Sequence, residues 1–254
     1  MGCDIHCYVE TLRSGSWHAE GDWICEYPDE DAVPDVPYKQ RFSDRNYNAF
    51  AILADVRNGR GTAGCDTGDG FNPICEPRGL PSDVTGEVKA VSDRWGIDGH
   101  SHSFFRLAEL LEFDWTQTTK LRGLAMLSDY YGWARYGRDQ GQAPREYCGG
   151  VYGPGIKIVS AEEADNIVAA CRQRIEALNE TQRPWEHEGA LREELEQMDE
   201  WNDDIRSRYY VRCEWTQPYY RCAGNFTGEF IYELMALSQQ PGVEDVRIVF
   251  WFDN

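Results

Sequence analysis

The chain has 254 residues, of which 41% are hydrophobic, and its 44 acidic and 25 basic side chains give a formal net charge of −19 at pH 7. The hydrophobic share is sufficient for a buried core and excludes a globally disordered chain. The negative charge argues against binding to duplex nucleic acid, because the two surfaces would repel each other. The sequence has no run of about 18 apolar residues, so no membrane-spanning helix is expected.

The cysteines and the first residues indicate a compartment. Nine cysteines are present without a Cys-x-x-Cys pair, which favours reduced, mostly buried thiols over a disulfide framework. The first residues are polar and include Asp4, His6 and Glu10, which is not typical of a signal peptide. The sequence therefore predicts a cytosolic protein.

Two strands joined by a turn are predicted at the amino terminus. Residues 2–10 alternate between apolar and polar side chains, the period of a strand. Residues 13–16 have the composition of a turn, and residues 17–25 are expected to return as a second strand. The acidic segment 28–37 contains three prolines and is expected to be a loop.

A helix and a long irregular stretch follow. Ser43 or Asp44 is expected to cap a helix that continues to Val56 and ends at Asn58-Gly59. Residues 59–103 are rich in glycine, proline and aspartate. A long irregular stretch in a compact domain is usually functional or covers a site.

The middle of the chain is interpreted as mainly helical. Ser103 is expected to cap a helix with an apolar face, and residues 119–136 are expected to continue helically. A glycine-rich loop at 149–155 leads to a short predicted strand at 156–159. The apolar face of the first helix would consist of Phe104, Leu107, Leu110 and Leu111.

A polar helical hairpin is predicted at 161–203. Ser160 and Glu163 form a capping-box pattern at its start. Pro184 is expected to separate its two helices. The hairpin has few large apolar residues, so its charged surface is interpreted as a solvated face, with a partner surface as the alternative.

The last elements complete the fold prediction. A strand is expected at 206–215, a helix at 226–237 and a strand at 246–252, whose nearly continuous apolar run is typical of a strand covered on both faces. We predict a single α+β domain over residues 1–254. Its mostly antiparallel central sheet would include both terminal strands, with helices packed on it and the hairpin inserted.

Two doublets of acidic and imidazole side chains suggest a polar site. In an extended backbone, residues i and i+2 project from one face. Asp4 with His6, and His100 with His102, could therefore each direct two groups at one ion or phosphate, as catalytic groups or as ligands of Zn²⁺, Mn²⁺ or Fe²⁺. Asp98 would orient a histidine. A metal-free binding site and purely structural hydrogen bonds are the alternatives.

A second group of residues has the chemistry of a nucleotide-binding site. Arginine side chains suit phosphate, and aromatic rings stack on bases. Surface pairing of the arginines with the many carboxylates is the alternative. The predicted ligand-binding residues are Arg45, Tyr47, Arg57, Asn58, Arg78 and Trp95.

Several blocks of the sequence resemble a family of uncharacterised bacteriophage proteins. They are the opening Met1–His6, the segment from Asp44 to Asn58, Pro77–Pro81, Asp98–His102 and the ending Arg247–Asn254. The resemblance implies a viral origin and a setting in the host bacterial cytosol. No activity is established for that family, so the resemblance assigns no catalytic residue in this sequence.

The first hypothesis for function is a metal-assisted hydrolase of a small phosphorylated or nucleotide-like substrate, such as a signalling nucleotide of host defence. The second is a binding protein that sequesters such a nucleotide unchanged. The third is an acidic inhibitor that docks on a host protein, based on the net charge of −19 and the hairpin.

Overall fold

The computed structural model describes residues 2–25, 32–178, 183–200 and 208–253. They form two compact units, each built from more than one segment. Unit 1 consists of Met1–Ala63, Gly70–Gln117 and Pro218–Asn254, and unit 2 consists of Gly64–Asp69 and Thr118–Gln217. The prediction of a single domain stays a prediction, and the two units are described separately below.

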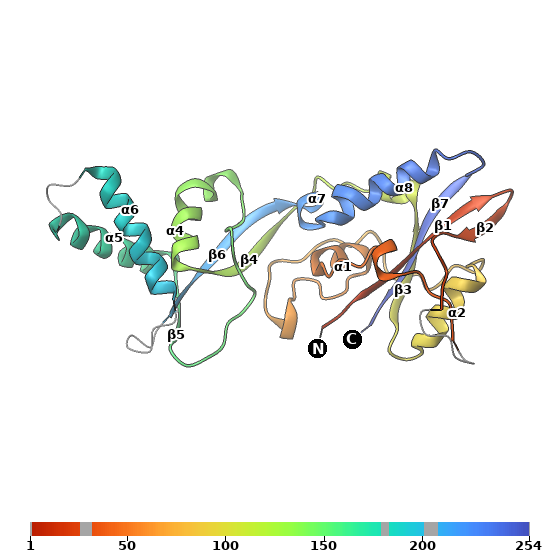
Figure 1. Ribbon diagram of the computed structural model, residues 1–254, viewed down its shortest axis with the longest axis horizontal. Coiled ribbons are helices and arrows are strands. Elements are labelled where there is room, and N and C mark those ends of the chain that lie inside the picture. Colours follow the sequence, from red (N-terminus) through yellow and green to blue (C-terminus); the bar gives the residue numbers. More distant parts are fainter. Residues whose placement is uncertain (1, 26–31, 179–182, 201–207, 254) are drawn as a thin grey trace. The chain divides into compact units, whose positions relative to one another are not determined.

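Unit 1 contains a four-stranded antiparallel sheet that joins the two ends of the chain (Figure 1). Its strands lie in the order β2 (Ser16–Ala19), β1 (Ile5–Arg13), β7 (Asp245–Phe252) and β3 (His100–Arg106). β1 pairs with β7 from Ile5 opposite Phe252 to Leu12 opposite Asp245. The predicted α+β fold, with both terminal strands in an antiparallel sheet, is confirmed.

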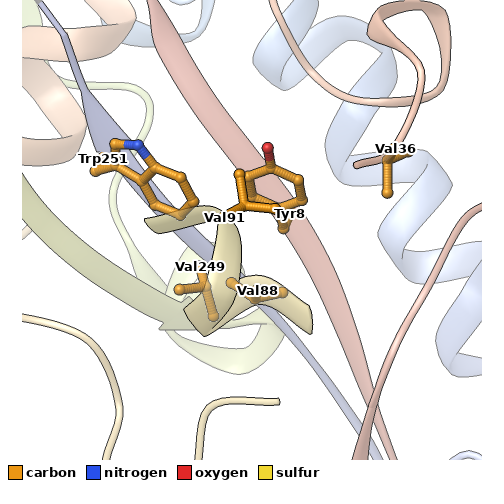
Figure 2. Close-up of a cluster of buried hydrophobic side chains, with 6 residues drawn as sticks. All are labelled: Tyr8, Val36, Val88, Val91, Val249 and Trp251. Atoms are coloured by element: carbon orange, nitrogen blue, oxygen red, sulfur yellow. The ribbon is translucent and has the colours of Figure 1, made fainter. Parts of the chain in front are cut away.

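Helices cover both faces of this sheet, because β7 is apolar on both sides. Seven of the eight residues of β7 are buried. On one face, Trp251 and Tyr8 form a core cluster with Val88 and Val91 of α2 (Figure 2). On the other face, the Phe252 ring lies 5.0 Å from Phe50 of α1. The helices of unit 1 are η1 (Tyr38–Gln40), α1 (Tyr47–Ala54), η2 (Thr62–Gly64, at the border of unit 2), α2 (Gly86–Trp95), α3 (Leu107–Glu112), α7 (Tyr219–Cys222), η4 (Phe226–Phe230) and α8 (Ile231–Ser238).

A buried ion pair joins β1 to β7. Arg247 Nε donates to Glu10 Oε2 over 2.6 Å, and these side chains are 3% and 0% exposed. The second Glu10 oxygen accepts from the Thr85 backbone N–H. Arg247 also donates to Asp83 and stacks on the Trp17 ring. Because Glu10 and Arg247 both have hydrogen-bonding partners, the two charges can be buried in the sheet.

Unit 2 contains a three-stranded sheet and the helical hairpin. The strands lie in the order β4 (Thr118–Met126), β6 (Arg208–Pro218) and β5 (Ile156–Val159), and β5 runs parallel to β6. The hairpin is confirmed as α5 followed by α6, and the Ser160–Glu163 capping box is formed. The helices of unit 2 are α4 (Leu127–Tyr136), η3 (Arg138–Gln140), α5 (Ala161–Leu178) and α6 (Pro184–Asp199). The predicted end of the hairpin at 201–203 lies outside the described residues.

Several predicted elements differ from the structure. Asn46, and not Ser43 or Asp44, caps α1. β2 ends at Ala19, whereas the predicted strand extended to residue 25. Residues 103–106 belong to β3, so Ser103 does not cap a helix, and the helix begins at Leu107. Residues 119–126 form β4, where buried and exposed positions alternate from Thr118 to Gly123 with the period of a strand. The stretch predicted to be irregular contains α2, whose Val88 and Val91 pack against the sheet.

Candidate functional site

The carboxylate of Asp253, directly after β7, connects two predicted site residues. Asp253 Oδ2 lies 3.1 Å from His6 Nε2, and Oδ1 accepts from the backbone N–H of Asp4 over 2.9 Å. His6 is 7% exposed. The pairing of β1 with β7 produces this contact, because it places the residue after β7 beside the residue before β1.

The side chain of Asp4 is held by Arg45, which precedes α1. Arg45 donates from Nε and from the second guanidinium nitrogen to the two Asp4 oxygens, over 2.6 and 2.5 Å. The side chains are 56% and 43% exposed. Because both side chains are partly exposed, an anion from solution can reach this pair and compete with Asp4 for Arg45.

Tyr47 and Arg57 complete the group around the first residues of the chain. The Cys3 backbone N–H donates to the Tyr47 hydroxyl over 3.4 Å, and the Arg57 guanidinium lies 5.0 Å from the Tyr47 ring centre. Trp95 of α2 covers His6, with 4.2 Å between ring centres. We call this connected group the terminal cluster; it consists of Cys3, Asp4, His6, Arg45, Tyr47, Arg57, Trp95 and Asp253.

A row of stacked rings supports the terminal cluster from the side of α2. The Trp251 ring lies between His6 and His102, with centre distances of 5.7 and 5.6 Å and interplanar angles of 19° and 18°. Tyr8 stacks on the same indole at 5.2 Å. His102 Nε2 lies 3.0 Å from the Ser92 hydroxyl of α2. The row fixes both imidazoles but places Trp251 between them.

A bulge in β3 separates His100 from His102. His100 lies opposite Phe252, whereas Ser103 lies opposite Phe250, and Ser101 between them has a φ of +52°. The extra residue breaks the alternation of side chains. His100 therefore shares the Phe252 face of the sheet, while His102 stacks on Trp251 on the opposite face. The expectation that the two imidazoles project from one face is wrong.

The remaining predicted residues have other surroundings. Asp98 is exposed in the turn after α2, and its backbone N–H donates to Trp95. Asn58 hydrogen-bonds with Asp55 and with both backbone groups of Phe71, so it fixes a loop. Arg78 pairs with Glu109 and stacks on Phe104, away from the contacts of the terminal cluster.

The four predicted metal ligands are not gathered at one point. Within the described ranges, no group of three or more His, Cys, Asp or Glu side chains is arranged to hold a metal ion. Asp4 is occupied by Arg45, and the bulge divides the two histidines of β3. A Zn²⁺, Mn²⁺ or Fe²⁺ cofactor stays a prediction.

The contact with Asp253 fixes the tautomer of His6. A carboxylate only accepts, so the contact with Asp253 requires the proton on His6 Nε2. In the neutral ring Nδ1 then carries a lone pair, and it is buried without a hydrogen-bond partner among the described residues. An imidazole oriented by a carboxylate is the arrangement of a general base.

Burial and neighbouring charges shift the pKa values of this region. Burial lowers the pKa of His6, and the hydrogen bond to Asp253 offsets part of this change. Burial also lowers the pKa of His102, with a smaller contribution from His100. The hydrogen bond from Arg45 lowers the pKa of Asp4. At neutral pH both imidazoles are therefore neutral, and Asp4 is ionised.

We expect the protein to lose stability as the pH falls below about 6.5, the ordinary pKa of histidine. The unfolded chain takes up protons on His6 and His102 at that pH, whereas the folded chain takes them up only at lower pH, so protonation favours unfolding. Urea denaturation at about pH 7.5 and about pH 5.5 measures the difference.

The matched variants for this pH dependence are His6→Gln and His18→Gln. His6→Gln should reduce the stability difference between the two pH values. His18 is exposed on β2, so His18→Gln should leave that difference unchanged. An equal pH dependence in the wild type and in His6→Gln would contradict the role given to His6.

Sequence reasoning missed Asp253, Ser92 and Trp251. Trp251 was visible only as part of an apolar strand. Asp253 lies directly after that strand, and pairing of the terminal strands would have placed it beside Asp4 and His6. No sequence pattern points to Ser92, because α2 was not predicted.

Comparison of the chain with protein-family models, with curated proteins and with solved structures finds no match. The resemblance to bacteriophage proteins therefore stays a prediction. Within the described ranges, the helices lack the combination of length and apolar character that crossing a membrane requires.

Proposed function

We propose that unit 1 binds a small phosphorylated or nucleotide-like ligand at the terminal cluster and releases it chemically unchanged. The observation that carries this proposal is the connected set of contacts from Arg45 through Asp4 and Asp253 to His6 and Trp95. These contacts join cationic, hydrogen-bonding and aromatic groups, the three kinds of group that nucleotide recognition uses.

The phosphate would be held by Arg45 and Arg57. Arg45 is more than half exposed, and a doubly charged phosphate would compete with Asp4 for its guanidinium group. Arg57 lies over the Tyr47 ring. The base would contact Tyr47 or Trp95, whose indole N–H is buried without a hydrogen-bond partner among the described residues.

A hydrolase is the second candidate, and the His6–Asp253 contact favours it. Once ligand binding opened a path to the buried Nδ1, His6 would take a proton from the attacking water, and Asp253 would stabilise the resulting imidazolium. A divalent metal would add phosphoryl polarisation. The resemblance to phage proteins suggests a signalling nucleotide of bacterial defence as the ligand in either case, and a host protein as a further partner.

Calorimetric titration of the full chain with cyclic dinucleotides and with ADP-ribose derivatives tests the proposal. We expect saturable binding that weakens about tenfold or more in Arg45→Met and in Arg57→Met, because each removes a charge-assisted hydrogen bond. Arg221→Met, an exposed arginine of α7, is the matched control and should bind like the wild type.

Chromatography of the ligand after denaturation distinguishes the two candidates. Recovery of intact ligand after incubation with and without Mn²⁺ supports binding alone. Turnover that is lost in His6→Gln would favour the hydrolase instead. If none of these nucleotides binds, or if both arginine variants bind like the wild type, the proposal is wrong.

A further inference from the structure

A cavity of about 370 Å³ lies in unit 1 between β1 and α8, apart from the terminal cluster. Small-molecule sites have volumes of about 300–1,000 Å³ and mostly apolar walls with a few polar groups. The walls of this cavity include Val9, Val36, Phe230, Leu234 and Leu237. Its size and its apolar walls are those of a binding site for a small organic molecule.

One cationic side chain, Arg41, lines this apolar cavity. Its side chain is 15% exposed, and it donates to the Tyr8 hydroxyl over 2.5 Å and to Asp35 over 3.2 Å. The Arg41 Nε–H is buried without a hydrogen-bond partner among the described residues. A buried donor without an acceptor costs about 1–3 kcal/mol, so a small shift of the Arg41 side chain that brought this N–H to a ligand oxygen would be favourable.

The local charge around Arg41 is positive. Asp35 is shared between Arg41 and Arg94, whose guanidinium lies 2.9 Å from the second Asp35 oxygen. Two cations and one carboxylate leave one net positive charge. The carboxylates at the cavity are Glu20, which accepts from Thr11 and Arg13, and Glu233, which is exposed on α8. Because Arg13 neutralises Glu20 and Glu233 is exposed to water, an anion is favoured only beside Arg41.

Cys7 of β1 is among the lining residues, and among the described strands none pairs with β1 at Cys7 on the side away from β7. Val9 C=O accepts from Glu20 N–H on the β2 side, and Asp4 C=O accepts from Asp253 N–H on the β7 side. Because backbone groups alternate along an antiparallel strand, Cys7 directs its N–H and C=O away from β7. β2 pairs only with Glu10–Arg13, and no other backbone hydrogen bond in the described part of the chain reaches Cys7.

We propose that this cavity binds a small amphipathic anion. Its apolar body would contact Val36, Leu234 and Leu237, and its acidic group would accept hydrogen bonds from Arg41. The site is separate from the terminal cluster, since the two share no residue. The proposal therefore does not depend on nucleotide binding.

Two probes of the same shape test the proposal: naphthalene-2-carboxylate and the neutral naphthalene-2-carboxamide. Ligand-observed NMR titration of the full chain measures both affinities. We expect the carboxylate to bind about tenfold or more tightly than the amide, because a charge-assisted hydrogen bond replaces a neutral one. Equal affinities, or no saturable binding of either probe, would overturn the proposal.

Three variants locate the binding. Arg41→Met should remove the preference for the carboxylate but retain weak binding of both probes. Leu237→Trp fills the cavity without changing its charge and should abolish both. Arg221→Met is the control, because Arg221 is exposed on α7 and does not line the cavity; it should keep the preference. Undiminished binding to Leu237→Trp would place the probes elsewhere and overturn the proposal, even if Arg41→Met does not fold.

Discussion

Replacing Glu10 with alanine should lower the free energy of unfolding by about 3–5 kcal/mol. Arg247 would remain buried, because its side chain is 3% exposed and lies between Trp17 and the sheet. Its charge would keep only Asp83, which is 60% exposed. The Thr85 N–H would lose its acceptor as well. Urea denaturation followed by near-ultraviolet circular dichroism measures the loss.

The matched control for Glu10→Ala removes both charges together. The double variant Glu10→Leu, Arg247→Met should recover most of the lost stability, because replacing a buried ion pair by apolar side chains is often neutral or stabilising. Asp83 remains mostly in water in this variant. A change below about 0.5 kcal/mol in Glu10→Ala, the usual range of a surface substitution, would show that the pair is not buried.

Replacing Trp251 with alanine should cost about 3–5 kcal/mol, the usual loss for a large aromatic side chain in a core. Trp251 is 0% exposed and contacts the rings of Tyr8, His6 and His102. Its removal leaves a cavity between β1, β3 and α2. Denaturation curves give the loss of stability, and histidine NMR signals report whether His6 and His102 keep their positions.

Trp185→Ala is the matched control for this substitution. Trp185 lies at the start of α6 and is 63% exposed, so its removal should change stability by less than about 0.5 kcal/mol. Similar losses in the two tryptophan variants would contradict the buried stack at Trp251.

The sequence predicted correctly those segments in which a single hydrophobic period or capping pattern is present. The apolar run of β7 predicted a strand covered on both faces, and the alternation of β1 predicted its neighbour. The hairpin followed from the Ser160–Glu163 capping box and from Pro184. In these segments local preference and tertiary packing favour the same structure.

The secondary-structure predictions were wrong where apolar residues fit both a helical and a strand period, or where one inserted residue interrupts the alternation of a strand. Residues 103–111 have apolar side chains at helical spacing, yet Phe105 packs against Phe250 as part of β3. α2 has a short apolar face of Val88 and Val91 within a glycine-rich region. Ser101 adds one residue to β3 and reverses the side on which His100 projects. A single bulge of this kind has no reliable sequence signal.

The candidate site was predicted in part for the same reasons. Asp4, His6, Arg45, Tyr47 and Arg57 were predicted and belong to the terminal cluster, because they lie on or beside elements whose prediction was correct. Trp95 joins them through α2. Arg78 was predicted only because arginine suits phosphate. Its pairing with Glu109 could not be foreseen, because the start of α3 at Leu107 was not predicted.

The position of β7 has a consequence for how the protein is made. The central strand of unit 1 is contributed by residues 245–252, and its ion pair with β1 joins residues separated by 237 positions. The ribosome synthesises β1 and β3 before β7. Because β7 lies between them in the sheet, neither strand can form its pairing with β7 until residues 245–252 have left the ribosome. Unit 2 is almost contiguous and can form earlier. The nascent chain would then contain one folded unit and one incomplete sheet with exposed apolar surface, the kind of species that chaperones bind.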